Sequence, residues 1–150
     1  MFRVDSKANR ITRLESARFS DLGLGERQHL QEWLANEAGA FGEELLIIQK
    51  EFAGFDDTKE RLDLLAIDKE GSLVVIENKL DDSGKDVVWQ GLKYASYCST
   101  LSKTNIANIY QLYLDKTGQG GSAQAKICDC RFRGQRRALC IDLQSNRRPS

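Results

Sequence analysis

Two aliphatic runs joined by a short polar link constrain this chain more than any other stretch. The runs cover residues 64–67 and 73–76, and the link, residues 69–71, ends in glycine. A three-residue hairpin loop requires a left-handed residue at its third position, which glycine adopts without steric cost. The pattern therefore predicts a hairpin of two antiparallel strands over residues 61–68 and 72–79.

The register of this hairpin gathers charged side chains. Asp63 falls opposite Glu77, and Lys79 shares a face with Glu77 because side chains alternate along a strand. Directly opposed residues have Cβ atoms about 5 Å apart, so two carboxylates there repel each other. A divalent cation between them removes this conflict, and oxygen ligands suit Mg²⁺. The alternative is a solvated face on which Lys79 neutralises Glu77, and spacing alone does not separate the two interpretations.

Length and composition fit one domain that buries a core. The chain has 150 residues, of which 41% are hydrophobic and 29% charged. No apolar run approaches the roughly 20 residues that span a bilayer, and no signal-peptide core follows Met1, so we expect a cytoplasmic protein without a membrane partner. The cysteines, at positions 98, 128, 130 and 140, form no C-x-x-C pair, which favours reduced thiols over a zinc site.

Charge is balanced overall but unevenly distributed. Residues 1–115 contain 14 Lys+Arg and 20 Asp+Glu, whereas residues 116–150 contain 8 and 2. We expect an N-terminal strand or hairpin extension over 1–22, a core over 23–115 and a basic, poorly patterned tail over 116–150. The tail either contacts phosphates or is a disordered end, and an incomplete C-terminal part is one explanation of it.

Apolar periodicity predicts further elements on both sides of the hairpin. They are one or two short strands with a turn near 8–9, a helix over 26–37, a strand over 45–52, helices over 86–101 and 104–115, strands over 125–132 and 138–143, and disorder over 144–150. Ser83 is the expected N-cap of the helix over 86–101. This order predicts an α/β fold, a central mixed sheet with an antiparallel meander flanked by helices.

The charged hairpin therefore lies between a helix that begins with Glu26 and a helix that carries Gln90. In metal-assisted hydrolysis of a phosphodiester, carboxylates fix Mg²⁺, which polarises the phosphate and lowers the pKa of a bound water. A lysine beside the metal orients that water and stabilises the growing charge, and a neutral amide holds a phosphate or a water. Glu26 also has a structural explanation, because a carboxylate is favoured in the first turn of a helix.

The spacing of Asp63, thirteen further residues and then Glu77-Asn78-Lys79 resembles the PD-(D/E)xK nuclease superfamily. The similarity is to the branch of NucS-type endonucleases and extends over roughly residues 20–115. The segments that carry it are 26–34, 61–65, 74–79 and 89–94. The resemblance implies a restriction-endonuclease-like core and a DNA endonuclease, in repair or defence, that uses Mg²⁺ or Mn²⁺.

The resemblance also implies roles for individual residues. Asp63 and Glu77 would be metal ligands, Lys79 the catalytic lysine, and Glu26 a helical acid that reaches the metal directly or through water.

Further residues are expected around this set. Gln90 and Tyr94 would line the active site, although an aromatic residue at helical spacing is commonly part of a core. Glu43 or Glu44 competes for the role of the upstream acid. Leu62 stands where the superfamily is named for proline.

A second function is consistent with the same residues. The chain could be a nuclease-like module for nucleic-acid binding or assembly, without activity of its own and lacking a C-terminal domain that completes the cleft. DNA is the expected partner in both cases. A homodimer is expected if an open sheet edge follows a truncated C-terminus, because open edges invite strand pairing.

Overall fold

The computed structural model describes residues 1–15, 17–53, 61–79, 84–128 and 136–142. For residues 20, 84–86 and 136–142 it describes the backbone alone. The predicted cap Ser83 and the predicted disorder over 144–150 lie outside the described residues. No helix in the described part of the chain is long and apolar enough to cross a membrane.

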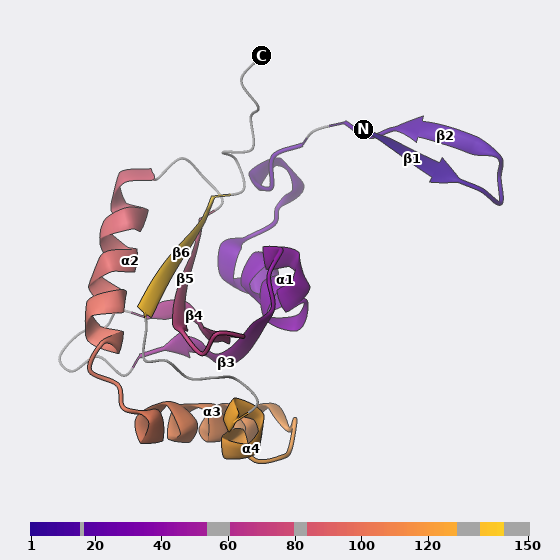
Figure 1. Cartoon of the computed structure of the whole chain (residues 1–150). Helices are drawn as coiled ribbons and strands as arrows, with labels where there is room; N and C mark the ends of the chain where they lie inside the picture. The colour runs from indigo at the N-terminus through magenta and orange to yellow at the C-terminus, as the bar shows by residue number, and fades with distance from the viewer. Residues whose placement is uncertain (16, 54–60, 80–83, 129–135, 143–150) are drawn as a thin grey trace.

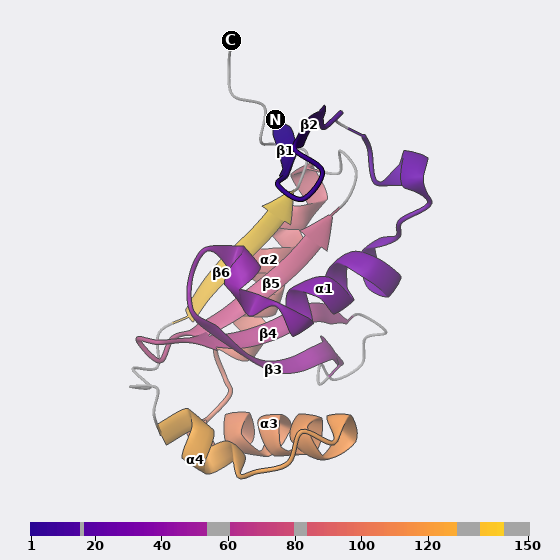
Figure 2. The same ribbon diagram turned by 90° about the vertical axis from the view of Figure 1, so that its right-hand side faces the viewer.

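A four-stranded mixed sheet forms the centre of the molecule (Figures 1 and 2). Strands β3 (Leu45–Phe52), β4 (Leu62–Asp68) and β5 (Leu73–Lys79) form the predicted antiparallel meander. Strand β6 (Arg136–Asp142) adds to the edge beside β5 and runs parallel to it. A parallel neighbour requires a long connection, whose described part here contains three helices.

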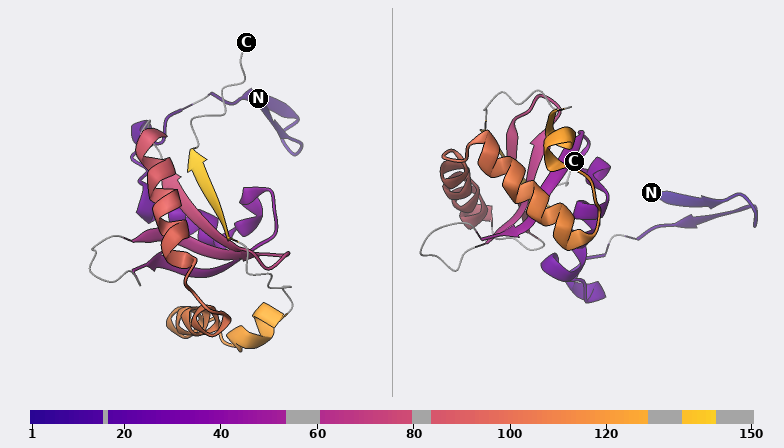
Figure 3. Two further views of the ribbon diagram at one scale, coloured as in Figure 1. Left: turned by 60° about the vertical axis from the view of Figure 1, so that its left-hand side comes forward. Right: turned by 90° about the horizontal axis from the view of Figure 1, so that it is seen from below.

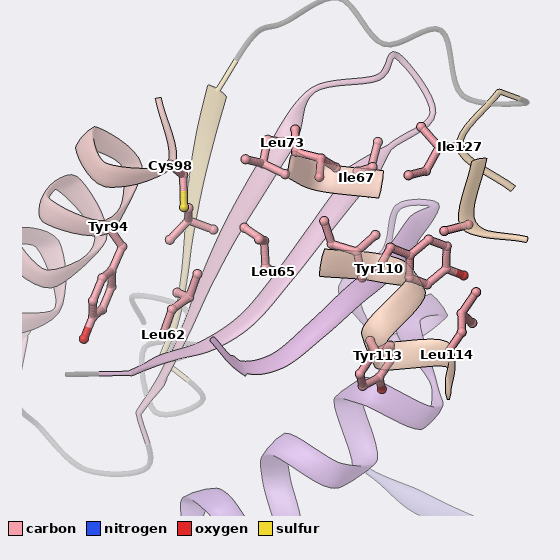
Figure 4. Close-up of a cluster of buried hydrophobic side chains, with 14 residues drawn as sticks. Leu62, Leu65, Ile67, Leu73, Tyr94, Cys98, Tyr110, Tyr113, Leu114 and Ile127 are labelled. Carbon is pink, nitrogen blue, oxygen red and sulfur yellow. The ribbon is translucent and has the colours of Figure 1, made fainter. Parts of the chain in front are cut away.

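Helices cover both faces of this sheet, so the α/β architecture of the prediction is confirmed. One face of the sheet is covered by helices α2 (Gly84–Cys98), α3 (Lys103–Thr117) and α4 (Ala123–Cys128). Their buried side chains and those of the sheet form one hydrophobic cluster, which includes Leu65 and Tyr110 (Figure 4). Figure 2 shows α1 (Gln31–Asn36) in front of the sheet and α2 behind it.

The hairpin between β4 and β5 has the predicted register. Ile67 pairs with Leu73 and Leu64 with Ile76, so one further step along both strands places Asp63 opposite Glu77. Gly71 adopts the left-handed conformation, with φ of 80°. The loop is also closed by the Asp68 carboxylate, whose Oδ1 accepts a hydrogen bond of 2.7 Å from the Ser72 backbone N–H.

The predicted helix over 26–37 is built from two kinds of turn. It begins as the five-residue π-helix η2 (Glu26–Leu30) and continues as α1, and a 3-10 turn, η3 (Ala38–Phe41), follows. Leu30 and Leu34 bury one side of it against the sheet, as their spacing predicted. Glu26 is therefore the first residue of a helical segment that packs on the sheet.

The described part of residues 116–150 differs from the prediction in one element. The strand predicted over 125–132 is wrong for residues 125–128, which are helical as part of α4, and residues 129–132 lie outside the described residues. Ala123 and Ile127, four residues apart, are both buried against the core, a spacing that places them on one face of a helix or of a strand. The strand predicted over 138–143 is confirmed as β6, and this strand covers the edge of β5.

The N-terminal segment forms a separate two-stranded sheet, as predicted. Strands β1 (Phe2–Asp5) and β2 (Arg10–Arg13) pair antiparallel around a turn in which Asn9 has a φ of 50°. This hairpin projects away from the central sheet (Figures 1 and 3). A short 3-10 turn, η1 (Ser20–Leu22), lies between it and η2.

The left-handed loop residue offers a direct test of the hairpin. Replacing Gly71 by alanine introduces a Cβ at a positive φ, so we expect a loss of about 1 kcal/mol in the free energy of unfolding. Urea denaturation measures this loss. The exposed neighbour Lys69, changed to alanine, should remain within about 0.5 kcal/mol of wild type. Equal effects at the two positions would contradict the loop assignment.

Candidate functional site

Charged side chains meet where β4 begins and β5 ends. Lys79 Nζ lies 3.4 Å from Glu77 Oε1 and 3.9 Å from Glu26 Oε2. The Asp63 carboxylate interacts electrostatically with Glu77 and with Lys79. The structure thus brings together four of the six predicted site residues, from η2, β4 and β5.

These side chains differ in how much solvent they meet. The Glu77 side chain is 5% exposed, the Lys79 side chain 21% and the Glu26 side chain 36%. Glu77 is therefore the buried member of the group, whereas the Glu26 and Lys79 side chains are partly exposed. A ligand that approaches from solvent meets Lys79 and Glu26 before it reaches Glu77.

Two neighbouring elements hold the Asp63 backbone and side chain. The Asn78 backbone N–H donates a hydrogen bond of 2.9 Å to Asp63 Oδ2. Gln31, on α1, donates from Nε2 to the Asp63 backbone carbonyl at 3.3 Å. The Asp63 carboxylate is therefore oriented from β5, and its backbone is held from the helix on the other side.

Burial sets the electrostatics of both acids. It raises the pKa of the Glu77 carboxyl to about 7, with a further increase from the charge on Asp63, and the Lys79 ammonium acts in the opposite direction. Burial also raises the pKa of Asp63, and the hydrogen bond from the Asn78 backbone N–H opposes that rise. Ionising both the Asp63 and the Glu77 carboxyl groups therefore costs free energy in the folded protein.

Tyr94 and Gln90 lie on α2, but they differ in role. Tyr94 is 3% exposed and lies in the core beside Leu62 (Figure 4). Its hydroxyl donates a hydrogen bond of 3.1 Å to the Arg61 carbonyl, just before β4 begins. Tyr94 thus anchors the start of the strand that carries Asp63. Gln90 is half-buried, and its Oε1 meets no donor among the described residues.

The competing acids Glu43 and Glu44 lie elsewhere. They precede β3, whose first residue Leu45 pairs with Asp68 at the loop end of the β4–β5 hairpin. Asp63 lies near the opposite end of β4. The meander therefore separates Glu43 and Glu44 from the carboxylate pair, and Glu26 is the upstream acid that the fold brings near it.

Sequence reasoning missed two buried amides beside the site. Gln31 is 2% exposed and Asn78 is fully buried. Gln31 Oε1 and both polar side-chain atoms of Asn78 have no hydrogen-bond partner among the described residues. A signal for Gln31 was present, since it lies three residues before Leu34 on the apolar side of the helix.

The donor set fits a hard divalent cation in part. Glu77 Oε2 is buried and meets no hydrogen-bond donor among the described residues, and carboxylate oxygen is the ligand that Mg²⁺ prefers. In the segments that the structure describes, no three His, Cys, Asp or Glu side chains lie close enough together to hold an ion. Lys79 lies between Glu77 and Glu26 and is ion-paired with both. Asp63 and Glu77 are therefore the two carboxylates that a cation could bind in this arrangement, because the Glu26 carboxylate is turned toward the lysine.

Comparisons of this chain with protein-family models, with curated proteins and with solved structures found no match. The candidate site therefore rests on its own geometry and on the motif spacing described above.

The raised pKa of Glu77 predicts how stability changes with pH. Between about pH 4.5 and 7 the folded chain binds this proton more tightly than the unfolded chain does, so stability falls as pH rises through that window. The loss is on the order of 3 kcal/mol. Glu77→Gln should flatten the dependence and be more stable than wild type at pH 8. Urea denaturation at pH 5 and pH 8 measures both, and equal pH slopes in the two proteins would contradict the assignment.

The hydroxyl of Tyr94 yields a separate prediction. Tyr94→Phe keeps the ring in the core but leaves the Arg61 carbonyl without this donor, so we expect a loss of about 1 kcal/mol in stability. Thermal or urea unfolding measures that loss. A variant as stable as wild type would show that the hydrogen bond is not a structural contact.

Proposed function

We propose that the protein is a metal-dependent DNA endonuclease that uses Mg²⁺ or Mn²⁺ to hydrolyse phosphodiester bonds. The observation that carries the proposal is the buried Glu77 carboxylate, which has one unpartnered oxygen and lies beside a second acid and a lysine. Buried like charges are destabilising unless a cation or a proton relieves them. A strand selected for stability alone has no need of this arrangement.

The cation would be held by Asp63 and Glu77. Such an ion supplies polarisation of the phosphate and a lower pKa for a bound water. Asn78 supports this role, because its backbone N–H orients the Asp63 carboxylate. Glu26, more exposed and ion-paired with Lys79, would join once that lysine turns toward the substrate.

Lys79 has the position and charge for work on the phosphate. Its side chain is partly exposed, and its ammonium lies between Glu77 and Glu26. There it can donate to a non-bridging phosphate oxygen and stabilise charge that grows during hydrolysis. Gln90, whose amide oxygen meets no donor among the described residues, is placed on the helix after β5 and can accept from a water without adding charge.

Replacement of the lysine tests the proposal. Wild-type protein is incubated with single-stranded, branched and mismatched DNA in the presence of Mn²⁺ or Mg²⁺, and the cleavage rate is measured. Lys79→Ala should reduce the rate by about 10²-fold or more, since it removes the donor that stabilises the transition state.

The matched control is Lys69→Ala, at the loop end of the same hairpin. This variant also loses a lysine side chain, but at the end of the hairpin opposite to Asp63 and Glu77. It should cleave DNA at the wild-type rate. No cleavage by wild type under any of these conditions, or equal loss in both variants, would overturn the nuclease assignment.

One observation favours a second candidate function, a nuclease-like module for nucleic-acid binding or assembly. Lys79 is paired with both Glu77 and Glu26, so the cluster neutralises much of its own charge. A module of this kind would bind DNA without divalent metal and would not cleave it. DNA binding by wild type in EDTA, with no cleavage after Mn²⁺ is added, would support the second function over the first.

A further inference from the structure

The N-terminal hairpin β1–β2 stands apart from the rest of the molecule. All eight residues of its strands are exposed, and Figures 1 and 3 show it extending away from the central sheet. A two-stranded hairpin alone is marginally stable in water, whereas three or more strands with an apolar face can be stable. This segment therefore needs a partner surface to persist as a sheet.

One face of the hairpin is apolar. Val4 pairs with Ile11 and Phe2 with Arg13, so these four side chains lie on the same face. Phe2 is 55% exposed, Val4 71% and Ile11 69%. The Arg13 guanidinium lies 5.8 Å from the centre of the Phe2 ring, and Val4 and Ile11 are the most exposed apolar side chains of that face.

Hydrogen bonding fixes which backbone groups of β1 face the open edge. The Leu14 N–H donates to the Met1 carbonyl at 3.0 Å, so these two residues form a hydrogen-bonded pair. Such pairs alternate with non-bonded pairs along an antiparallel ladder. Phe2 and Val4 therefore direct their N–H and C=O groups away from β2, toward the open edge of β1.

We propose that β1 pairs antiparallel with β1 of a second copy of this chain, about a two-fold axis through Val4. The two Val4 residues then form a mutual hydrogen-bonded pair, since their backbone groups point to the open edge. The same register places Arg3 of each copy opposite Asp5 of the other. The result is a four-stranded sheet, β2-β1-β1-β2, with a continuous apolar face.

Charge complementarity selects this register over the symmetric ones centred on Arg3 and on Asp5. An axis through Arg3 places two arginines opposite each other, and an axis through Asp5 places two aspartates there. Pairing through the open edge of β2, about Ile11, places Arg10 opposite Thr12 and makes no ion pair.

The carboxylate that this pairing uses is already oriented. Asp5 Oδ1 accepts hydrogen bonds of 3.0 Å from the backbone N–H groups of Lys7 and Ala8, which hold the side chain at the end of β1. An ordered carboxylate loses less conformational entropy when it meets an arginine than a freely rotating one does.

The test is the mass of the full chain in solution, measured by analytical ultracentrifugation over a range of concentrations. Wild type should form dimers. Val4→Pro removes an N–H that β2 does not use, so the hairpin can remain while the intermolecular bonds are lost. We expect dimerisation at least about tenfold weaker, which corresponds to roughly 1.4 kcal/mol.

The matched control is Ile11→Pro, which removes the N–H that faces the open edge of β2. It should dimerise as wild type does, whereas Arg3→Asp, which brings acids together, should weaken the dimer. Amide NMR signals of residues 2–13 report whether each variant keeps the hairpin. The proposal is overturned by a wild-type monomer at all concentrations, by equal effects of the two prolines, or by a hairpin that binds DNA as a monomer.

Discussion

The burial of the Glu77 carboxylate is the constraint on which the candidate site depends. Two acids face each other at one end of a largely aliphatic hairpin, and burial makes their charges costly. Lys79 offsets part of that cost, and the Asn78 backbone N–H offsets another part at Asp63. Well-packed apolar residues commonly replace a buried ionic group without loss of stability. Under the proposed function, the charges at this position serve the chemistry of the site and not the stability of the fold.

Buried polar atoms without partners occur at the candidate site and on a helix next to it. Among the described residues they belong to Gln31, Glu77, Asn78 and Gln90, which come from α1, β5 and α2. Native structures contain few such atoms, since each one costs free energy that water or a ligand can recover. Gln31 and Asn78 each donate a hydrogen bond to Asp63, so three of these four residues lie at the candidate site.

The sequence predicts best those parts of the fold that depend on residues close together in the chain. The glycine loop and the alternation of side chains determine the register of the β4–β5 hairpin, and through it the meeting of Asp63 and Glu77. The short apolar stretch that forms α4 fits the spacing of a helix and that of a strand, so its contacts with the core determine which of the two it forms. The approach of Glu26 and the role of Gln31 depend on how a helix crosses the sheet, which spacing does not specify. The exclusion of Glu43 was already implied by the antiparallel meander.

The parallel pairing of β6 with β5 also bears on the order in which the molecule assembles. Strand β5 carries Glu77 and Lys79, and one of its two neighbours comes from residues 136–142, some distance along the chain. Contacts between distant residues form late, because a long loop must close first. During synthesis the meander can form early, but the strand that carries the charged pair keeps an unpaired edge until residue 142 has emerged. The nascent chain therefore passes through a stage in which this edge is open to other strands, when a chaperone would have the most effect.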